Sequence, residues 1–374
     1  MTNPNDRDPY SEAADPVKIG CLLDNPKPFT DCALKIYQFV AEQYVASGRF
    51  ERGFEFVGLR PWGPPAGSIQ SSIEGFHSLV DQGCIAIIGG HHSDDSIALT
   101  KYADRHEIPF MATGASANVM SKWSFSLPWS SIPHDMFTIV SWLRRKGHKT
   151  VVVTWDMAAH CEEFFETFRV ACARGGIQIV ADERFPQTLV PNLDEIFDRA
   201  VRRFQKLEPD ALVALGTGWV IPTWAGHVNK AGWDIPRIMN DCYHAATMPR
   251  FSANFEGWTG CTMWDDNNEV CNKFYADFYA RFPEVPKFGH EMISLFRDAM
   301  TALIEGIVLA PILTRDGVRD GLEKVQMLPA ASGGPRTCIG FSHYNHRGLQ
   351  GPDIMVLRHY KDGKDRMEGY VELF

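Results

Sequence analysis

The stretch CIAIIGGHHSDDSIALTKYADRHEIPFMATGAS, residues 84–116, carries the pattern that decides the fold. It begins with an apolar run at 84–90 and continues with apolar residues at helical spacing over 93–106. A second apolar run at 108–112 ends in the small residues of 114–116. Unbroken apolar runs of this length are typical of strands that are buried on both faces of a parallel sheet. The stretch therefore predicts a β-α-β unit.

The same alternation continues on both sides of this unit. Short apolar runs are each followed by a longer segment with helical spacing, which predicts an open, doubly wound α/β architecture with right-handed crossovers. The predicted strands are residues 17–23, 150–155, 210–216 and 234–239, and the predicted helices are 31–46, 69–81, 135–146, 161–174, 193–207, 268–281 and 290–310.

Three irregular stretches interrupt the alternation, at residues 124–134, 255–269 and 331–348. They predict two α/β lobes between which the chain crosses three times. The strand ends of both lobes would then face a shared cleft, where open α/β sheets bind ligands. We expect one lobe to comprise 17–130 and 258–340, the other 131–257 and 341–374, and residues 1–16 to form a flexible N-terminal segment.

The composition excludes several classes of protein. The 374 residues are 45% hydrophobic and 22% charged, which is typical of a folded globular chain. The formal net charge of −9 argues against nucleic acid or an anionic membrane surface as partner. The most apolar long stretch, 292–313, contains Arg297, Asp298 and Glu305, so it predicts a buried amphipathic helix rather than membrane insertion.

The N-terminus and the cysteines bear on the location of the protein. Residues 1–16 contain no apolar run of the kind that a secretory signal requires. The nine cysteines are scattered and include no Cys-x-x-Cys, which favours buried free thiols in a reducing compartment. We therefore expect a cytoplasmic protein. The alternative is a periplasmic protein whose signal has been removed from this chain.

Four segments together resemble a known family: 84–116, TVVVTWDMAAHCEEFFETF at 150–168, FRDAMTALIEGI at 296–307 and GFSHYNHRGLQGPDIMVLRHYKDG at 340–363. The chain resembles the periplasmic-binding-protein type I family, and within it the leucine/isoleucine/valine-binding branch of ABC-transporter substrate-binding proteins. The resemblance implies a two-lobed protein that closes by hinge motion on a small-molecule ligand. It also implies, as partner, either an ABC importer or a protein regulated by a cytoplasmic ligand sensor of this fold.

The sequence departs from the family pattern at two loops. His160-Cys161 stands where the family usually has Tyr-Gly, and residues 91–95 stand where a Ser/Thr cluster often holds a ligand carboxylate. Asp94 and Asp95 would repel a carboxylate unless they point away, which argues against a plain aliphatic amino acid as ligand.

The resemblance and the predicted strand ends together identify candidate ligand-binding residues. Ser93 also fits a helix N-cap, with Asp94 and Asp95 complementing the helix dipole. Asp241 is the best counter-ion for a cationic ligand group. The candidates are His92, Ser93, Gly114, Ala115 and Ser116 in the first lobe and Trp155, Asp156, His160, Thr217, Trp219, Asp241 and Tyr243 in the second.

Aromatic residues at predicted strand ends and loops favour a bulky apolar or aromatic ligand that is partly polar. Tryptophan is usually a core residue, so we expect most of these rings simply to pack. The aromatic candidates for the cleft are Phe29, Trp62, Trp129, Trp155, Trp219 and Trp264.

An enzyme on the same fold is the alternative function. Gly216-Thr217-Gly218 follows a predicted strand, but Ile221 breaks the dinucleotide fingerprint, and we expect no cofactor. A divalent metal could bind the loop formed by His91, His92, Asp94 and Asp95, joined by His160 or by His290-Glu291. Neighbouring histidines rarely face one ion, so we expect a binding protein without metal or catalytic residues.

Overall fold

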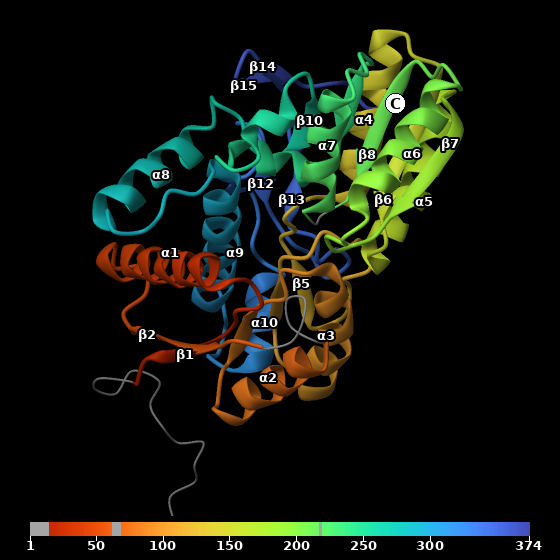
Figure 1. Ribbon diagram of the computed structural model, residues 1–374. Helices are drawn as coiled ribbons and strands as arrows, with labels where there is room; N and C mark the ends of the chain where they lie inside the picture. Colours follow the sequence, from red (N-terminus) through yellow and green to blue (C-terminus); the bar gives the residue numbers. More distant parts are fainter. Residues whose placement is uncertain (1–14, 62–68, 217–218) are drawn as a thin grey trace, which may run out of the picture.

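The computed structural model describes residues 15–61, 69–216 and 219–374. Figure 1 shows two lobes, each built around a twisted sheet, with the chain passing between them. The sheet of the first lobe is parallel throughout. Its strand order is β2 (Phe54–Leu59), β1 (Val17–Leu22), β3 (Ala86–Gly89), β4 (Phe110–Ala112) and β5 (Ser124–Ser126).

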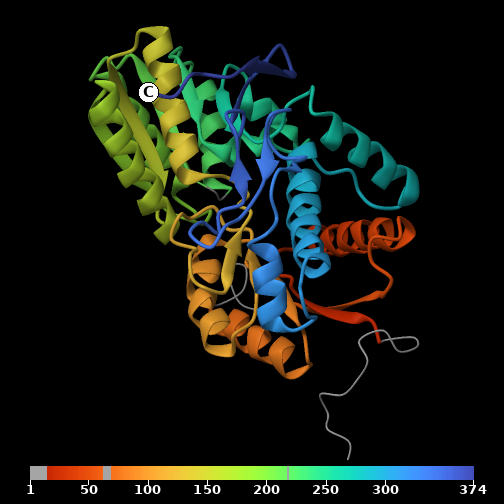
Figure 2. The same cartoon turned by 180° about the vertical axis from the view of Figure 1, so that it is seen from behind.

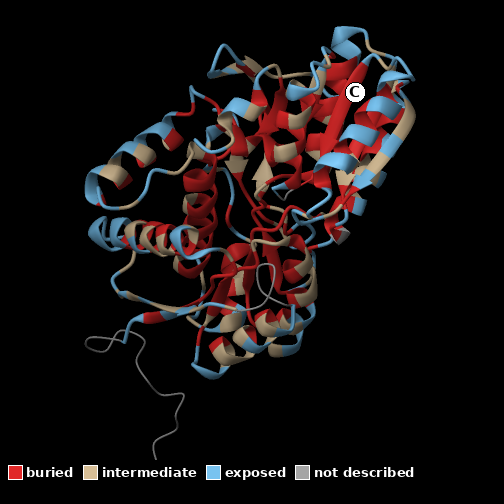
Figure 3. Cartoon of the chain, viewed as in Figure 1, coloured by how far each residue is buried: buried red, intermediate tan, exposed pale blue. Residues whose placement is uncertain are grey.

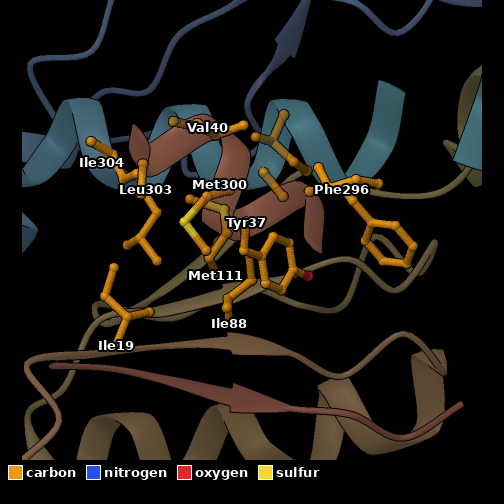
Figure 4. Packing of buried hydrophobic residues seen from close by; sticks show 14 of the residues in the cluster. Ile19, Tyr37, Val40, Ile88, Met111, Phe296, Met300, Leu303 and Ile304 are labelled. Atoms are coloured by element: carbon orange, nitrogen blue, oxygen red, sulfur yellow. The ribbon is translucent and has the colours of Figure 1, made fainter. Parts of the chain in front are cut away.

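Helices cover both faces of the first sheet. On one face, α1 (Lys27–Ala46) and α9 (His290–Val308) pack over apolar side chains of the strands. Figure 4 shows this core, in which Ile19, Ile88 and Met111 lie beneath residues of the two helices. On the other face lie α2 (Ile69–Asp81) and α3 (Ser93–His106). Strands buried on both faces thus explain the unbroken apolar runs of the sequence.

The sheet of the second lobe is mixed. Its strands from β10 to β7 are parallel, and β14 and β15 add an antiparallel hairpin at one edge. The order is β15 (Lys364–Gly369), β14 (Val356–Lys361), β10 (Thr259–Thr262), β9 (Arg237–Met239), β8 (Ala211–Leu215), β6 (Thr150–Asp156) and β7 (Gln178–Phe185).

Helices again cover both faces of this second sheet. One face carries α4 (Ile132–Lys146) and α5 (Ala159–Gly175), and the other carries α6 (Leu193–Gln205) and α7 (Val220–Lys230). Figure 3 shows the result, with buried strands between helices whose outer faces are exposed. The remaining elements are η1 (Asp241–Thr247), η2 (Ser252–Phe255), α8 (Glu269–Arg281), α10 (Arg315–Leu322) and a small sheet of β11 (Leu328–Pro329), β12 (Cys338–Ile339) and β13 (Leu349–Gln350).

The three crossings between the lobes are bonded to one another. The amide of Gly333 donates to the carbonyl of Met263 at 2.6 Å, and the amide of Ser126 donates to the carbonyl of His346 at 2.8 Å. The buried carboxylate of Asp298 on α9 accepts from two further amides of the third crossing. These bonds join the crossings into one hinge, and Figure 2 shows the blue segments of the third crossing beside α9, between the two lobes.

Two expectations about the chain can be compared with this architecture. The segment 258–340, expected in the first lobe, includes Thr259–Thr262, which pairs in the second sheet as β10. The irregular stretch 255–269 hides this four-residue strand, because it is too short to form a periodic pattern. Residues 292–308 of the apolar stretch 292–313 lie in α9, which is nearly fully buried as expected, and residues 309–313 follow the helix. Within the described chain, no helix combines the length and apolar character that a membrane crossing requires.

Candidate ligand-binding site

The first-lobe wall of the cleft begins where β3 ends and α3 starts. His92 is the N-cap residue of α3. The carboxylate of Asp24, which follows β1, accepts the backbone N–H of His91 at 2.8 Å and that of His92 at 3.4 Å. Amides at a helix N-terminus are natural anion ligands, and here a side chain of the chain itself binds them.

The second loop of this wall follows β4 and packs against the first turn of α3. The hydroxyl of Ser93 accepts the backbone N–H of Ser116 at 3.2 Å. A Cβ on Gly114 would lie 2.8 Å from the hydroxyl of Ser96 and 2.9 Å from the Cα of Ser93, so only glycine fits there. Ser93 and Gly114 therefore position the loop that carries Ser116.

The second lobe contacts this loop through Glu163 on α5. One oxygen of Glu163 accepts the N–H of Ala117 at 2.8 Å, and the other bonds the hydroxyl of Ser116 and the amide nitrogen of Asn118. Ala115 packs with the second lobe's apolar core. The two lobes are thus in contact on this side of the cleft, which encloses Ser116.

A second contact between the lobes joins α5 to α3. Nδ1 of His160 lies 3.5 Å from a carboxylate oxygen of Asp94. Burial lowers the pKa of His160, but the nearby carboxylates of Asp94, Asp156 and Asp241 outweigh it, so the net shift is upward. His160 and Asp94 therefore form an ion pair across the cleft when the histidine is protonated.

Buried acids gather around the ends of β6 and β9, near the hinge. Burial raises the pKa of Asp241 to about 7, and the carboxylate of Asp156 adds to the shift. Asp135 at the start of α4 also has its pKa raised well above the usual range, by burial and by Asp241. Glu291 at the start of α9 has its pKa raised to about 8, mainly by burial. The region therefore holds more buried carboxyl groups than nearby cations.

A cavity of about 210 Å³ opens beside these acids, between the lobes. Its walls come from both lobes and from the crossings. Tyr243 lines it, as do three of the expected aromatic residues. The lining side chains that matter most are Phe29, Trp129, Tyr243, Trp264, Phe288 and Glu291.

One wall of the cavity is a stack of rings. Trp264 and His290 stack with centroids 4.5 Å apart, and His290 stacks in turn on Tyr275 at 3.9 Å. The guanidinium of Arg358 lies 3.8 Å from the centroid of Trp264. The carboxylate of Asp365 accepts from Arg358 at 2.7 Å and from the hydroxyl of Tyr243 at 2.9 Å. This wall is therefore rigid and its cation is compensated.

Of the expected ligand-binding residues that the structure describes, Tyr243 lines this cavity and the others do not. Those outside the lining are His92, Ser93, Gly114, Ala115, Ser116, Trp155, Asp156, His160, Trp219 and Asp241. Trp155 stacks on Phe165 and donates to Asp182, both in its own lobe. Trp219 is 39% exposed and packs with Phe251 and Arg250. Both Thr217 and Trp62 lie outside the described residues.

The proposed metal loop does not assemble into a ligand set. The four expected ligands lie close in sequence, but His91 and His92 are held by Asp24 through their backbone, and Asp94 faces His160. In the described parts of the chain, no group of three or more His, Cys, Asp or Glu side chains is arranged to hold a metal ion.

Sequence reasoning missed the roles of three residues. Asp24 follows a predicted strand, which is the signal that could have identified it. Glu163 lies three residues after His160 on the same face of the helix, and this spacing is the only sequence feature that could have identified it as a residue of the cleft. Glu291 was considered only as a metal ligand. Each role depends on contacts between distant segments.

Comparison with known proteins identifies the relatives of this chain. The model of a family described as periplasmic binding protein matches residues 62–364. No curated protein sequence matches the chain. A type 1 periplasmic binding protein from Bordetella pertussis Tohama I has 18% identity and a TM-score of 0.77, over 95% of this chain and 100% of its own.

Two further solved structures share the fold. The leucine-binding protein LivK from Thermotoga maritima MSB8 has 18% identity and a TM-score of 0.77, over 95% of this chain and 99% of its own. An ABC-transporter solute-binding protein from R. palustris, solved with benzoate, has 18% identity and a TM-score of 0.75. That match covers 96% of this chain and 97% of the R. palustris chain.

The expectation of a cytoplasmic location was wrong. The matching family is one of periplasmic binding proteins, and a similar structure is described as an extracellular ligand-binding receptor from Rhodopseudomonas palustris HaA2. All nine cysteines are free, and all but Cys338 are buried. Burial raises the pKa of Cys84 to about 11 and that of Cys172 to about 12, so little reactive thiolate forms. Such thiols persist in an oxidising compartment, which is why they did not indicate location.

Proposed function

Because residues 62–364 match the family model, the chain belongs to the periplasmic binding protein family, and we propose that the protein binds one small organic molecule between its lobes. The family is one of binding proteins rather than enzymes. The observation that carries the proposal is the cavity of about 210 Å³, whose walls come from both lobes and from the crossings. A ligand there would contact every part of the molecule that moves when the lobes open.

The proposed ligand is an aromatic or bulky apolar molecule with at least one polar group. Phe29, Trp129 and Phe288 provide apolar walls, and Glu291 provides a buried polar group. A dry apolar cavity of about 150 Å³ accommodates benzene. A cavity of about 210 Å³ therefore suits one ring with a short substituent. The R. palustris structure solved with benzoate supports a ligand of this size.

The proposed mechanism is hinge closure. The three crossings are bonded to one another, while Glu163 and His160 on α5 contact the first lobe only through side chains. Opening would break these contacts and leave the hinge intact. A bound ligand adds contacts to both lobes and so favours the closed form.

The proposed partner is an ABC importer. Several structures of the same fold are described as ABC-transporter substrate-binding proteins. In this role the closed, loaded form would be the one that a membrane transporter recognises. The two outer lobe faces on either side of the cleft change their relative position on closure and could report the bound state.

A thermal-shift screen of small organic molecules, followed by native mass spectrometry of the hits, tests the proposal. A ligand present at 100 times its Kd stabilises the folded state by about 2.7 kcal/mol, which raises Tm by several degrees. We expect one molecule bound per chain, recovered unchanged. Chemical conversion of the bound molecule, or a screen in which no compound stabilises the protein, would contradict a binding function.

A further inference from the structure

We propose that the molecule bound in this cavity is an organic cation, with an ammonium or amidinium group on an aromatic or apolar body and without a carboxylate. The inference rests on the proposed function, since it concerns the ligand of the same site. Two features of the lining support it: the carboxyl group of Glu291 and the aromatic walls.

In the cleft beside the cavity, carboxylates of the chain bind backbone donors. Asp24 accepts the N–H groups of His91 and His92, and Glu163 accepts the N–H of Ala117. These groups do not line the cavity itself, so the inference depends on the residues of the lining.

Glu291 is a nearly buried carboxyl group of the cavity lining, where the indole Nε1 of Trp264 also has no hydrogen-bond partner. The side chain of Glu291 lines the cavity, and the residue is 7% exposed. One carboxyl oxygen accepts the N–H of Met263 at 2.9 Å. The second oxygen has no hydrogen-bond donor in residues 15–61, 69–216 or 219–374. A buried carboxylate is costly unless a cation or donor compensates it, and a ligand cation would do so.

Acidic groups outnumber basic groups around Glu291. Asp241, Asp135 and Asp365 surround it, and Asp241 and Asp365 help to raise its pKa. Arg358 opposes them, but it is bonded to Asp365 at 2.7 Å and to Asp266 at 2.9 Å.

The remaining basic groups of the lining do not offset this excess of acidic groups. Burial lowers the pKa of His244 and of His290, so both are neutral at pH 7. Lys287 is exposed to solvent at the cavity rim. No cation of the described lining therefore neutralises Glu291 directly.

The aromatic walls suit a cation as well as an apolar body. Phe29 and Phe288 lie with ring centroids 4.9 Å apart, and Trp129 lies edge-on to His244 at 5.3 Å. The faces of such rings attract a cation electrostatically. A carboxyl group beside aromatic rings thus forms a binding site for an ammonium or amidinium group.

Calorimetric titration with three compounds that share one ring tests the inference: benzylammonium, benzyl alcohol and benzoate. Benzamidinium, phenethylammonium and choline extend the cationic set, and leucine extends the set with a carboxylate. We expect at least one cation to bind, and each uncharged or carboxylate compound to bind at least tenfold more weakly. Near pH 7.5 we also expect proton release on binding, because the cation ionises Glu291; two buffers of different ionisation enthalpy measure it.

Two variants identify the counter-ion. Glu291→Gln keeps an oxygen for the N–H of Met263 but removes the charge, so cation affinity should fall at least tenfold and proton release should vanish. Glu166→Gln is the matched control, because it removes the same charge from an exposed position on α5 that pairs with Arg169. If Glu291→Gln does not fold, Trp129→Leu should weaken the cation relative to benzyl alcohol.

The outcomes separate this inference from the proposed function. Benzoate or leucine binding as tightly as the cations would overturn the cationic ligand and leave a ligand-binding protein. The inference is also overturned if no cation binds, or if Glu291→Gln binds cations like the parent protein. A screen in which no small molecule of any charge stabilises the protein would instead remove the proposed function.

Discussion

Glu163 is the residue through which the second lobe contacts the loop after β4. Its two oxygens bond Ser116, Ala117 and Asn118, all in the first lobe. Hydrogen bonds to a charged group contribute about 1.5–3 kcal/mol each when their partner is removed. A single side chain therefore provides several of the hydrogen bonds between the lobes.

Replacing this residue should open the cleft. Glu163→Gln retains one acceptor oxygen but loses the charge, and we expect the radius of gyration of the ligand-free protein to increase in X-ray scattering. The free energy of unfolding should fall by about 1–2 kcal/mol, because the contact stabilises the native state. Glu166→Gln on the same helix serves as control. Identical scattering curves for Glu163→Gln and the parent protein would show that this contact does not hold the lobes together.

Glu291 makes a separate prediction about pH. Its pKa is about 8 in the folded state against 4.5 for the free side chain, so the folded state retains a proton that the unfolded state has lost between these values. Its contribution to stability is complete below pH 4.5 and is lost as pH rises through 8. Glu291→Gln does not titrate and escapes this loss.

As pH rises from 5 to 8, the parent protein should therefore lose unfolding free energy that Glu291→Gln does not lose. We expect a shift of at least about 1.4 kcal/mol, the equivalent of one pKa unit. Urea unfolding at pH 5, 6.5 and 8 measures it, and comparing variant with parent cancels the titration of other groups. A constant difference across this range would mean that Glu291 is ionised in the folded protein.

At the scale of elements, most helices and most central strands could be predicted from the sequence, but α7, α10, the central strand β10 and the edge strands could not. The predicted helices 69–81 and 93–106 coincide with α2 and α3, because amphipathic spacing ends where the burial ends. The strands β2, β7 and β15 lie at sheet edges and are only partly buried, so they show no unbroken apolar run. Without that run, sequence pattern alone does not distinguish them from loops.

The candidate site was predictable only in part, for a related reason. Strand ends indicate which loops face the cleft, and this rule suggested Tyr243 and the aromatic residues Phe29, Trp129 and Trp264 at the cavity. It did not indicate that Trp155 would stack within its own lobe. Nor does sequence spacing reveal contacts between lobes, which depend on the hinge angle.

Helix packing in the first lobe depends on two glycines. A Cβ on Gly321 of α10 would collide with the carbonyl of Gly306 on α9, and a Cβ on Gly306 would meet Leu322. We expect Gly321→Ala to lower the free energy of unfolding by about 1–3 kcal/mol, because the helices must separate. Gly53→Ala, whose Cβ would meet only Pro16 at 3.9 Å, is the control in the same urea titration. Equal stability of the two variants would contradict the close packing of α9 on α10.

At the scale of the whole molecule, the two lobes share one hinge and one cavity. Three crossings bonded to one another allow rotation of the lobes while both cores stay intact. The net charge of −9 does not indicate the ligand, and the proposal about its charge depends on the residues that line the cavity. The cavity lies between the two parts that the hinge joins, so a ligand bound there contacts both lobes.

X-ray scattering of one variant with and without ligand tests this account most directly. Glu163→Gln weakens a side-chain contact between the lobes, so closure in this variant depends more strongly on the ligand than in the parent protein. The account predicts that a molecule bound in the cavity reduces the radius of gyration of Glu163→Gln to that of the closed parent protein. Saturation with the ligand without any change in the scattering curve would contradict binding between the lobes.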